Sequence, residues 1–282
     1  MIPESRLYTF IDEPREFALY FLEGQGLVQD VALIHPIRGK GFAYFRDVVL
    51  SVQPMVALLK GGEQFGFYID SEQPYFRLKI ETAHHGSTRC MLLPEDFQEF
   101  PEALYGWVRV LKLQPDRAPY ESVLKAEGLP LREIVNRVLH DSYQVNCAMM
   151  LSQVSDQSVM LHQLPLPAGH DESGDSLDAV RSRREGIRSA VEEIFALGLH
   201  EEGRIVDAFR PIGFRLLARR PMRFRCSCSR ERMVENVRPV YRREGGALFE
   251  PGARDLEVVC EYCKSRYRVA RTELDADAGR QH

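Results

Sequence analysis

The chain has 282 residues, of which 44% are hydrophobic and 28% are charged, and its formal net charge is −4. This length suits one large domain and one small one, and the composition is that of an ordinary globular protein. The acidic balance excludes a protein that binds nucleic acid over its whole surface, although it allows a local basic patch. The first 16 residues carry six charged side chains and no apolar core of a signal peptide, so we expect a cytoplasmic protein with no membrane partner.

The first 60 residues give mixed signals. Residues 17–22 and 48–59 carry apolar side chains at spacings that suit either a helix or a buried strand. Residues 64–93 are clearer, because apolar and polar side chains alternate on both sides of a turn at 71–74. This alternation predicts a hairpin or meander with one buried face.

Residues 94–119 are rich in turn formers. Apolar positions between 120 and 139 suit helical packing, with a break at the Gly-Leu-Pro of 128–130. Two further strands are expected at 143–151 and 158–166.

A helical pattern over 177–197 follows an acidic stretch, and Ser176 would be its N-cap. Gly186 and Gly198 weaken this helix by ~1 kcal/mol each relative to alanine. Its narrow apolar face consists of Val180, Ile187, Val191 and Ile194. Such a helix is marginal unless it packs on a neighbour. The simpler interpretation is a connecting helix, and a functional role is the alternative.

Four of the six cysteines form two close pairs near the C-terminus, Cys226-Ser227-Cys228 and Cys260-Glu261-Tyr262-Cys263, with 31 residues between them. In a reducing compartment such pairs are more often metal ligands or redox centres than structural disulfides. Two close pairs on separate turns supply four thiolates to one tetrahedral ion, an arrangement that zinc prefers. The spacing therefore predicts one zinc ion held by Cys226, Cys228, Cys260 and Cys263.

The remaining cysteines, Cys90 and Cys147, lie in strand-like apolar stretches, and we expect them to be buried and inert. The pair His84-His85 has no spaced acidic or cysteine partner and is interpreted as part of a polar turn.

Residues 219–243 contain nine arginines and two glutamates, a local charge of +7. Cationic surroundings favour the thiolate form of cysteine, although a solvated basic face or a polyanion-binding patch would give the same pattern. Small zinc modules unfold without their metal, and oxidised sulfur binds zinc poorly. These properties together predict a switch in which an oxidant displaces zinc and the local fold is lost.

The sequence around the cysteines resembles the 33-kDa heat-shock chaperone family, the bacterial redox-regulated holdases. The resemblance rests on Phe-Arg-Cys-Ser-Cys-Ser-Arg-Glu-Arg at 224–232 and Val-Cys-Glu-Tyr-Cys at 259–263. Residues 161–165 look like the end of that family's large domain, and residues 214–221 resemble the approach to its zinc module. Spacing and order match from residue 55 to residue 274, and the first 50 residues match loosely.

The resemblance implies an N-terminal α+β core domain (1–170), a metastable helical linker (171–221) and a C-terminal zinc-binding redox-switch domain (222–282). It implies that the reduced, zinc-bound protein is inactive. Oxidation would join Cys226 to Cys228 and Cys260 to Cys263, release zinc and unfold the linker.

The exposed surface would then hold unfolding client proteins without ATP, and the active form would be a homodimer. Candidate client-binding surfaces are the apolar face of the 177–197 helix and the hairpin at 65–80. We expect no enzymatic activity and no nucleic-acid partner.

The sequence departs from the family pattern in three places. Residues 71–74 replace the usual Gly-Asp-Gly-Pro turn, and glycines at 245, 246 and 252 interrupt the segment between the cysteine pairs, where a clean helix is usual. Lys264 replaces the usual glycine after the second pair, so it must accept backbone angles that glycine takes freely. These changes bear on the tuning of the switch.

Two other functions would use the same cysteines. A zinc-ribbon nucleic-acid binder would use the arginines of 219–243 and would weaken steeply with salt, but no aromatic stacking platform lies beside them. A thiol oxidoreductase using Cys260 and Cys263 would need its first cysteine at the start of a helix, whereas 266–269 is predicted to be a strand. Only the chaperone hypothesis requires apolar surface that is exposed after oxidation alone.

Overall fold

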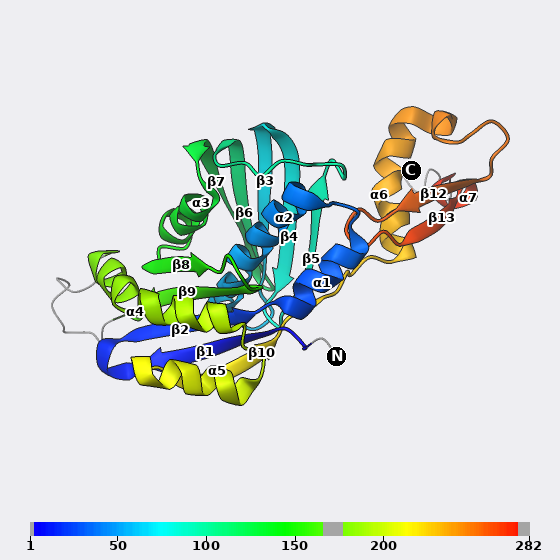
Figure 1. Ribbon diagram of the computed structural model, residues 1–282. Coiled ribbons are helices and arrows are strands. Elements are labelled where there is room, and N and C mark those ends of the chain that lie inside the picture. Colours follow the sequence, from blue (N-terminus) through cyan, green and yellow to red (C-terminus); the bar gives the residue numbers. More distant parts are fainter. Residues whose placement is uncertain (1–2, 166–176, 276–282) are drawn as a thin grey trace. The chain divides into compact units, whose positions relative to one another are not determined.

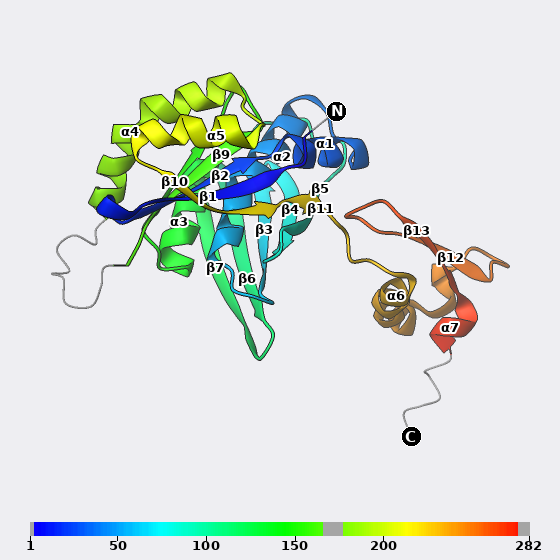
Figure 2. The same ribbon diagram turned by 90° about the horizontal axis from the view of Figure 1, so that it is seen from below.

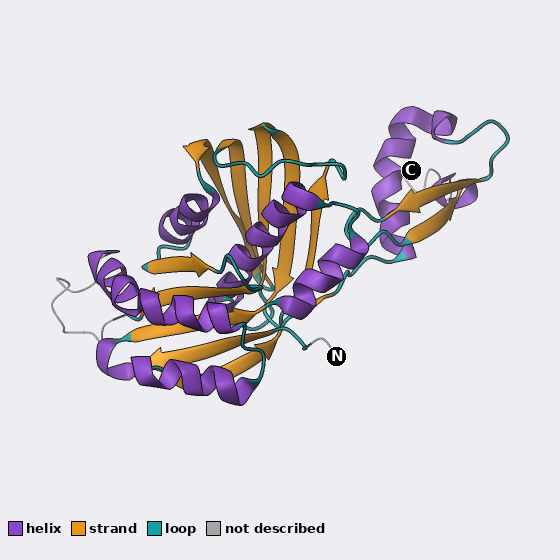
Figure 3. Cartoon of the chain, viewed as in Figure 1, coloured by secondary structure: helices purple, strands orange, loops and turns teal. Residues whose placement is uncertain are grey.

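The computed structural model describes residues 3–165 and 177–275. The chain divides into two compact units, unit 1 (Met1–Phe224) and unit 2 (Arg225–His282), which are described separately. Unit 1 contains two sheets and several helices, and unit 2 contains a strand pair and two α-helices (Figures 1 and 3). The predicted α+β fold class is confirmed.

The first sheet of unit 1 has five antiparallel strands. In spatial order they are β10 (Arg215–Pro221), β1 (Arg6–Asp12), β2 (Phe17–Glu23), β9 (Gln157–Gln163) and β8 (Cys147–Leu151). In the register of the central strands, Leu19 lies opposite Phe10 on one side and Leu161 on the other. The sheet thus joins the two ends of unit 1, because β10 pairs with β1.

Every residue of β2 is buried, because helices and strands cover both faces of this sheet. Phe17, Leu19 and Phe21 point to one face and pack with α4 (Leu177–Leu197) and α5 (Glu202–Phe209). Figures 1 and 2 show these two helices side by side on that face. The alternate side chains of β2 point to the other face and enter the main core of unit 1.

The second sheet has six strands. In spatial order they are β11 (Arg223–Phe224), β5 (Ser87–Leu93), β4 (Tyr75–Ala83), β3 (Gln64–Gln73), β6 (Leu104–Gln114) and β7 (Arg117–Leu129). Only β11 is parallel to its neighbour. The predicted alternation is confirmed, since Phe65, Phe67 and Ile69 are buried on one face of β3. These side chains share the main core with residues of several helices. Those helices are α1 (Gln25–Ile34), α2 (Gly39–Val52), the 3-10 helix Gln53–Leu58 and α3 (Leu131–Arg137).

Unit 2 is built on one helix and one hairpin. Helix α6 (Arg230–Glu244) begins after Ser229, whose hydroxyl accepts the N–H of Arg232 at 3.3 Å as an N-cap. Strands β12 (Asp255–Val259) and β13 (Arg266–Ala270) form the hairpin, and α7 (Arg271–Asp275) follows it. Their shared core is small, and its buried residues are Met233, Val234, Phe249, Cys260, Val269 and Leu274.

Two predictions in the middle of unit 1 are wrong. Residues 104–114 form strand β6 rather than turns, and residues 120–129 belong to strand β7 rather than to a helix. In β6 the buried residues Leu104, Val108 and Val110 alternate with exposed ones, so the strand signal is present in the sequence. Strand β7 lies at the edge of the sheet. Its hydrogen bonding to β6 outweighs the helix-like spacing of its own apolar residues.

Other boundaries agree more closely. The 177–197 helix is confirmed over its whole predicted range, and 266–269 lies in a strand as predicted. The predicted cap Ser176 lies outside the described residues. The segment between the cysteine pairs does contain a long helix, α6, which ends where Gly245 adopts a positive φ.

Candidate metal centre

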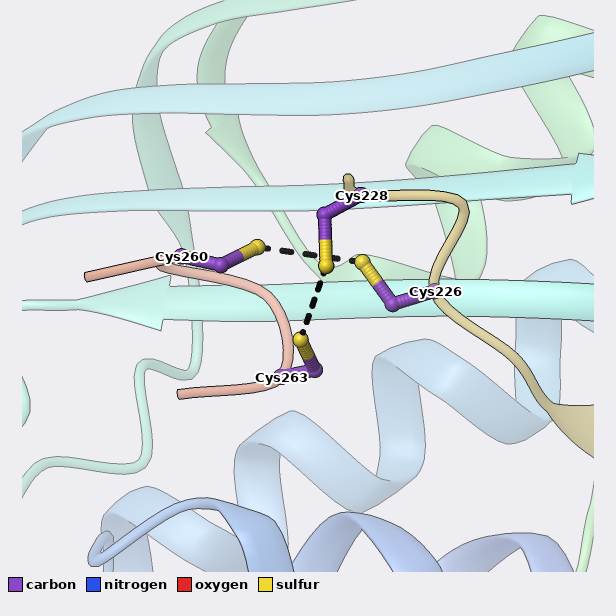
Figure 4. Close-up of side chains that lie close together, drawn as sticks. All are labelled: Cys226, Cys228, Cys260 and Cys263. Carbon is purple, nitrogen blue, oxygen red and sulfur yellow. Dashed lines mark hydrogen bonds between the residues drawn. The ribbon is translucent and has the colours of Figure 1, made fainter. Parts of the chain in front are cut away.

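The four clustered cysteines come together in unit 2. Their Sγ atoms all lie within 4.8 Å of one another, although 31 residues separate the two pairs in the sequence. The sulfur of Cys226 lies 3.7 Å from that of Cys260, and the sulfur of Cys228 lies 3.3 Å from that of Cys263. Figure 4 shows the four sulfurs converging from two loops. None of the four is part of a disulfide, so their sulfurs are available as ligands.

The geometry fits a tetrahedral ion. Metal–sulfur bonds of ~2.3 Å at tetrahedral angles place neighbouring sulfurs ~3.8 Å apart. The distance between Cys226 and Cys260 is within a few tenths of an ångström of that value, and small rotations would equalise the rest. Four sulfur donors select a soft ion rather than magnesium or calcium. The cluster is therefore a candidate site for a thiolate-binding metal.

The first pair is positioned by the start of α6. Cys226 and Cys228 lie between β11 and the helix, and Ser229 is the helix N-cap. The guanidinium of Arg232 reaches back and donates to the carbonyl oxygen and the hydroxyl of Ser227 at 2.8 and 2.7 Å. These bonds fix the short loop that presents both sulfurs.

The second pair lies on the turn between β12 and β13. The N–H of Cys260 donates to the carbonyl of Ser265 at 2.9 Å, and the N–H of Lys264 donates to the carbonyl of Cys260 at 2.8 Å. Lys264 has φ +60, so the expectation that it takes a glycine-like conformation is confirmed. Its ammonium pairs with Glu261 at 2.9 Å. The hairpin register thus brings Cys260 and Cys263 to one side of a tight turn.

The thiols of the cluster differ in acidity. Burial tends to raise the pKa of Cys263, but hydrogen bonds from Ser265 and from the neighbouring thiols lower that pKa to about 7. Burial raises the pKa of Cys228, a shift that the hydroxyl of Tyr267 partly opposes. Cys263 is therefore partly ionised near neutral pH, in the form that binds metal and reacts with oxidants.

Sequence reasoning missed two hydroxyls beside the sulfurs. The Tyr267 oxygen lies 3.0 Å from Cys228 Sγ, and the Ser265 oxygen lies 3.2 Å from Cys263 Sγ. Tyr267 belongs to β13, which was predicted, but only the fold of the loop before α6 brings Cys228 next to it. The sequence feature that could have indicated this contact is the position of Tyr267, four residues after Cys263.

The two remaining cysteines are buried, as predicted. Burial raises the pKa of the Cys90 thiol and raises that of Cys147 to about 12. Such thiols are poorly reactive. His84 and His85 lie on the turn between β4 and β5, where the Nδ1 of His84 accepts the N–H of Gly62 at 3.1 Å.

The apolar face proposed for client binding is covered in this structure. Val180, Ile187, Val191 and Ile194 are at most 4% exposed and pack on the five-stranded sheet. Client binding at these residues therefore stays a prediction that requires α4 to leave the sheet.

Part of the predicted basic run is neutralised within the chain. Arg219 pairs with Glu202, and Arg230 pairs through both nitrogens with Glu273. Within the described ranges 3–165 and 177–275, no helix is long and apolar enough to cross a membrane.

Comparisons with known proteins point to one family, whose model matches nearly the whole chain. A family model described as "Hsp33 protein" matches residues 5–270. The "33 kDa chaperonin" of Nitrosococcus oceani is 26% identical over 214 residues, which cover 73% of this chain and 70% of that protein. The "33 kDa chaperonin" of Neisseria meningitidis serogroup B is 26% identical over 259 residues, covering 86% and 82%.

A solved structure has the same fold. The 33 kDa chaperonin (heat shock protein 33 homolog) from Thermotoga maritima matches with a TM-score of 0.74, over 98% of this chain and 97% of that chain. Sequence identity is 14%, so this likeness concerns the fold.

Replacing Lys264 with glycine is expected to tighten metal binding. A non-glycine residue at φ +60 costs roughly 1 kcal/mol, and glycine keeps the N–H that donates to Cys260. Because glycine also gains freedom in the unfolded chain, we expect a roughly threefold lower metal dissociation constant. Competition with a chromophoric chelator on the reduced full chain would measure it. Lys264→Ala is the matched control, and equal tightening by alanine would assign the effect to the lost charge instead.

Proposed function

The chain belongs to the Hsp33 family of chaperones, and from this premise we propose that it is a redox-regulated, ATP-independent holdase. In this proposal it binds unfolding proteins and prevents their aggregation under oxidative or heat stress. The observation that carries the proposal is the convergence of four thiols in a unit with a small core.

Zinc is the metal proposed for the reduced state, held by Cys226, Cys228, Cys260 and Cys263. It supplies a structural cross-link and has no redox chemistry of its own. The four sulfur donors and their near-tetrahedral spacing support this assignment. In small metal-bound domains, metal binding contributes on the order of 10 kcal/mol to folding. Loss of the ion would accordingly unfold much of unit 2, whose core is small.

Oxidation is the proposed trigger for metal loss. A peroxide converts one thiolate to a sulfenic acid, which a second thiolate attacks to form a disulfide. We propose that the neighbours combine, Cys226 with Cys228 and Cys260 with Cys263. Each disulfide removes two ligands at once, so the ion is released. The cross-pair sulfur contacts at 3.7 and 3.3 Å belong to the metal-binding arrangement, and the loops would rearrange before neighbours join.

Helix α4 is the element proposed to leave unit 1 on activation. Outside its apolar face it is charged and exposed, so it depends on docking for its stability. One polar contact reinforces the docking: Arg183 donates to the buried carboxylate of Asp12 at 2.7 Å and to the carbonyl of Ile212 at 2.9 Å. The guanidinium also lies 5.1 Å from the ring centre of Phe214.

Release of α4 would uncover part of the apolar face of the five-stranded sheet. Helix α4 contacts β8 and β9, whose buried side chains on this face include Ala148, Val159 and Leu161. Phe10 and Phe21 of the neighbouring strands pack on Phe209 of α5. Exposed apolar surface of this kind would bind the apolar segments of unfolded clients. It would also favour association of two copies, which supports the proposed homodimer of the active form.

The gating is tested with a heat-unfolding client protein. We expect the reduced, zinc-loaded chain to leave client aggregation unchanged, and the peroxide-treated chain to suppress it at near-equimolar ratio. Light scattering at mild heat measures both. Equal suppression by the two forms would contradict redox gating, and no suppression by either would contradict the chaperone proposal.

The disulfide pairing is tested by peptide mapping of the oxidised chain. We expect Cys226–Cys228 and Cys260–Cys263 to account for most of the disulfide, because neighbours on one loop have the highest effective concentration once the ion has left. Mass spectrometry after digestion without reduction distinguishes these from cross-pairs. Predominance of Cys226–Cys260 would contradict the proposal.

The role of α4 is tested by placing a charge beneath it. Val191 is fully buried against the sheet, and Val191→Asp would cost several kcal/mol while the helix stays docked. We expect this variant to suppress client aggregation in the reduced, zinc-bound state. Ser189→Asp, on the exposed face of the same helix, is the matched control and should stay inactive until oxidised. An inactive, folded Val191→Asp variant would exclude release of α4 as the activating step.

A further inference from the structure

Two hydroxyl groups that are not metal ligands contact the sulfur cluster. The Tyr267 hydroxyl lies 3.0 Å from Cys228 Sγ, and the Ser265 hydroxyl lies 3.2 Å from Cys263 Sγ. The Tyr267 hydroxyl thus contacts the first cysteine pair, and the Ser265 hydroxyl contacts the second pair. The two hydroxyls differ in how firmly the backbone holds them, because Tyr267 is part of strand β13 and Ser265 is exposed on the turn.

The position of Tyr267 is set by the hairpin. In the register of β12 and β13 it lies opposite Val258, and its ring packs against the core of unit 2. A ring held in this way has few rotamers to choose from, so its oxygen is fixed beside Cys228. A phenol placed by a strand is a more rigid donor than a serine on a turn.

The direction of the hydrogen bond follows from the state of the sulfur. A cysteine that binds metal is a thiolate and carries no proton. The Tyr267 O–H must then donate to Cys228 Sγ, and its hydrogen occupies a lone pair of that sulfur. Hydrogen bonds from residues that are not ligands orient the ligand side chains and tune the properties of the bound metal.

We propose that Tyr267 sets the oxidant threshold of the cluster by holding Cys228 as a poorly reactive, metal-retaining thiolate. Tyr267 acts through Cys228 and is therefore a positioning residue. The inference rests on the proposed redox function and goes beyond it, because it assigns the sensitivity of the switch to a residue that binds no metal.

The chemistry affected is the attack of sulfur on a peroxide. A sulfur lone pair forms an S–O bond, the O–O bond breaks, and hydroxide leaves. A second thiolate then attacks the sulfenic sulfur, the S–S bond forms, and a second hydroxide leaves. The two sulfurs lose two electrons, which reduce the peroxide. A hydrogen bond donated to a lone pair of Cys228 Sγ makes this sulfur a poorer nucleophile. It therefore slows the attack of Cys228 on the peroxide, and also its attack on a sulfenic acid formed at another cysteine.

The test compares two tyrosine-to-phenylalanine variants of the full, zinc-loaded chain. In Tyr267→Phe we expect peroxide to release zinc about tenfold faster, followed with a metallochromic indicator. The control is Tyr241→Phe, because the Tyr241 hydroxyl lies in the same unit but donates to Asp275 at 2.8 Å. It should release zinc at the wild-type rate. Equal rates in all three proteins would overturn the proposal.

A second readout separates the hydrogen bond from packing. With cobalt(II) in place of zinc, losing a donor on a thiolate raises the energy of its lone pair and moves the sulfur-to-metal charge-transfer band to longer wavelength. We expect this shift in Tyr267→Phe and not in Tyr241→Phe. An unshifted band, or zinc loss from Tyr267→Phe without peroxide, would assign Tyr267 a packing role.

The two proposals fail in different ways. Peroxide-driven zinc release without any suppression of client aggregation would remove the chaperone function and leave the role of Tyr267 standing. Redox-gated suppression of client aggregation, with an unchanged rate of zinc release from Tyr267→Phe, would leave the chaperone function standing and remove the role of Tyr267.

Discussion

The cysteine cluster joins two turns that lie far apart in the chain, one before α6 and one between β12 and β13. The other contacts between these parts of unit 2 include a small core, with six buried residues of which one is Cys260, and exposed ion pairs such as Arg230–Glu273. A core of this size supplies only a few kcal/mol of folding free energy. On our proposal, whether this unit is folded depends on the chemical state of four sulfur atoms.

Unit 1 is organised differently, because its core does not depend on sulfur chemistry. The main core lies between two sheets, and the five-stranded sheet carries a second apolar cluster on its other face. This second cluster is completed by α4 and α5, which follow the core strands in sequence. If α4 leaves the sheet as we propose, apolar surface is exposed on this face while the main core on the other face keeps the sheet folded. The arrangement suits a protein that must stay folded while it binds unfolded chains.

The sequence predicted the parts whose structure is decided locally. The alternation of Phe65, Phe67 and Ile69 and the helical spacing of α4 are both properties of a short segment, and both were found. Strand β7 was missed because its pairing with β6, rather than its own spacing, determines its structure. The four cysteines of the candidate metal centre could be predicted from their spacing alone. The neighbouring hydroxyl of Tyr267 could not, because its contact with Cys228 joins residues that lie far apart in the sequence.

Lys264 shows how this chain can lack the family's glycine and still form the turn. Its φ of +60 costs roughly 1 kcal/mol relative to glycine. Its N–H still donates to Cys260, and its ammonium pairs with Glu261 on the same turn. A partly exposed pair of this kind contributes under about 1 kcal/mol, which offsets part of the strain. By contrast, a hydrogen bond to a charged sulfur contributes roughly 1.5–3 kcal/mol. In the proposed metal-bound state, the hydroxyl of Tyr267 would therefore have more influence on the stability of the cluster than the residue at position 264.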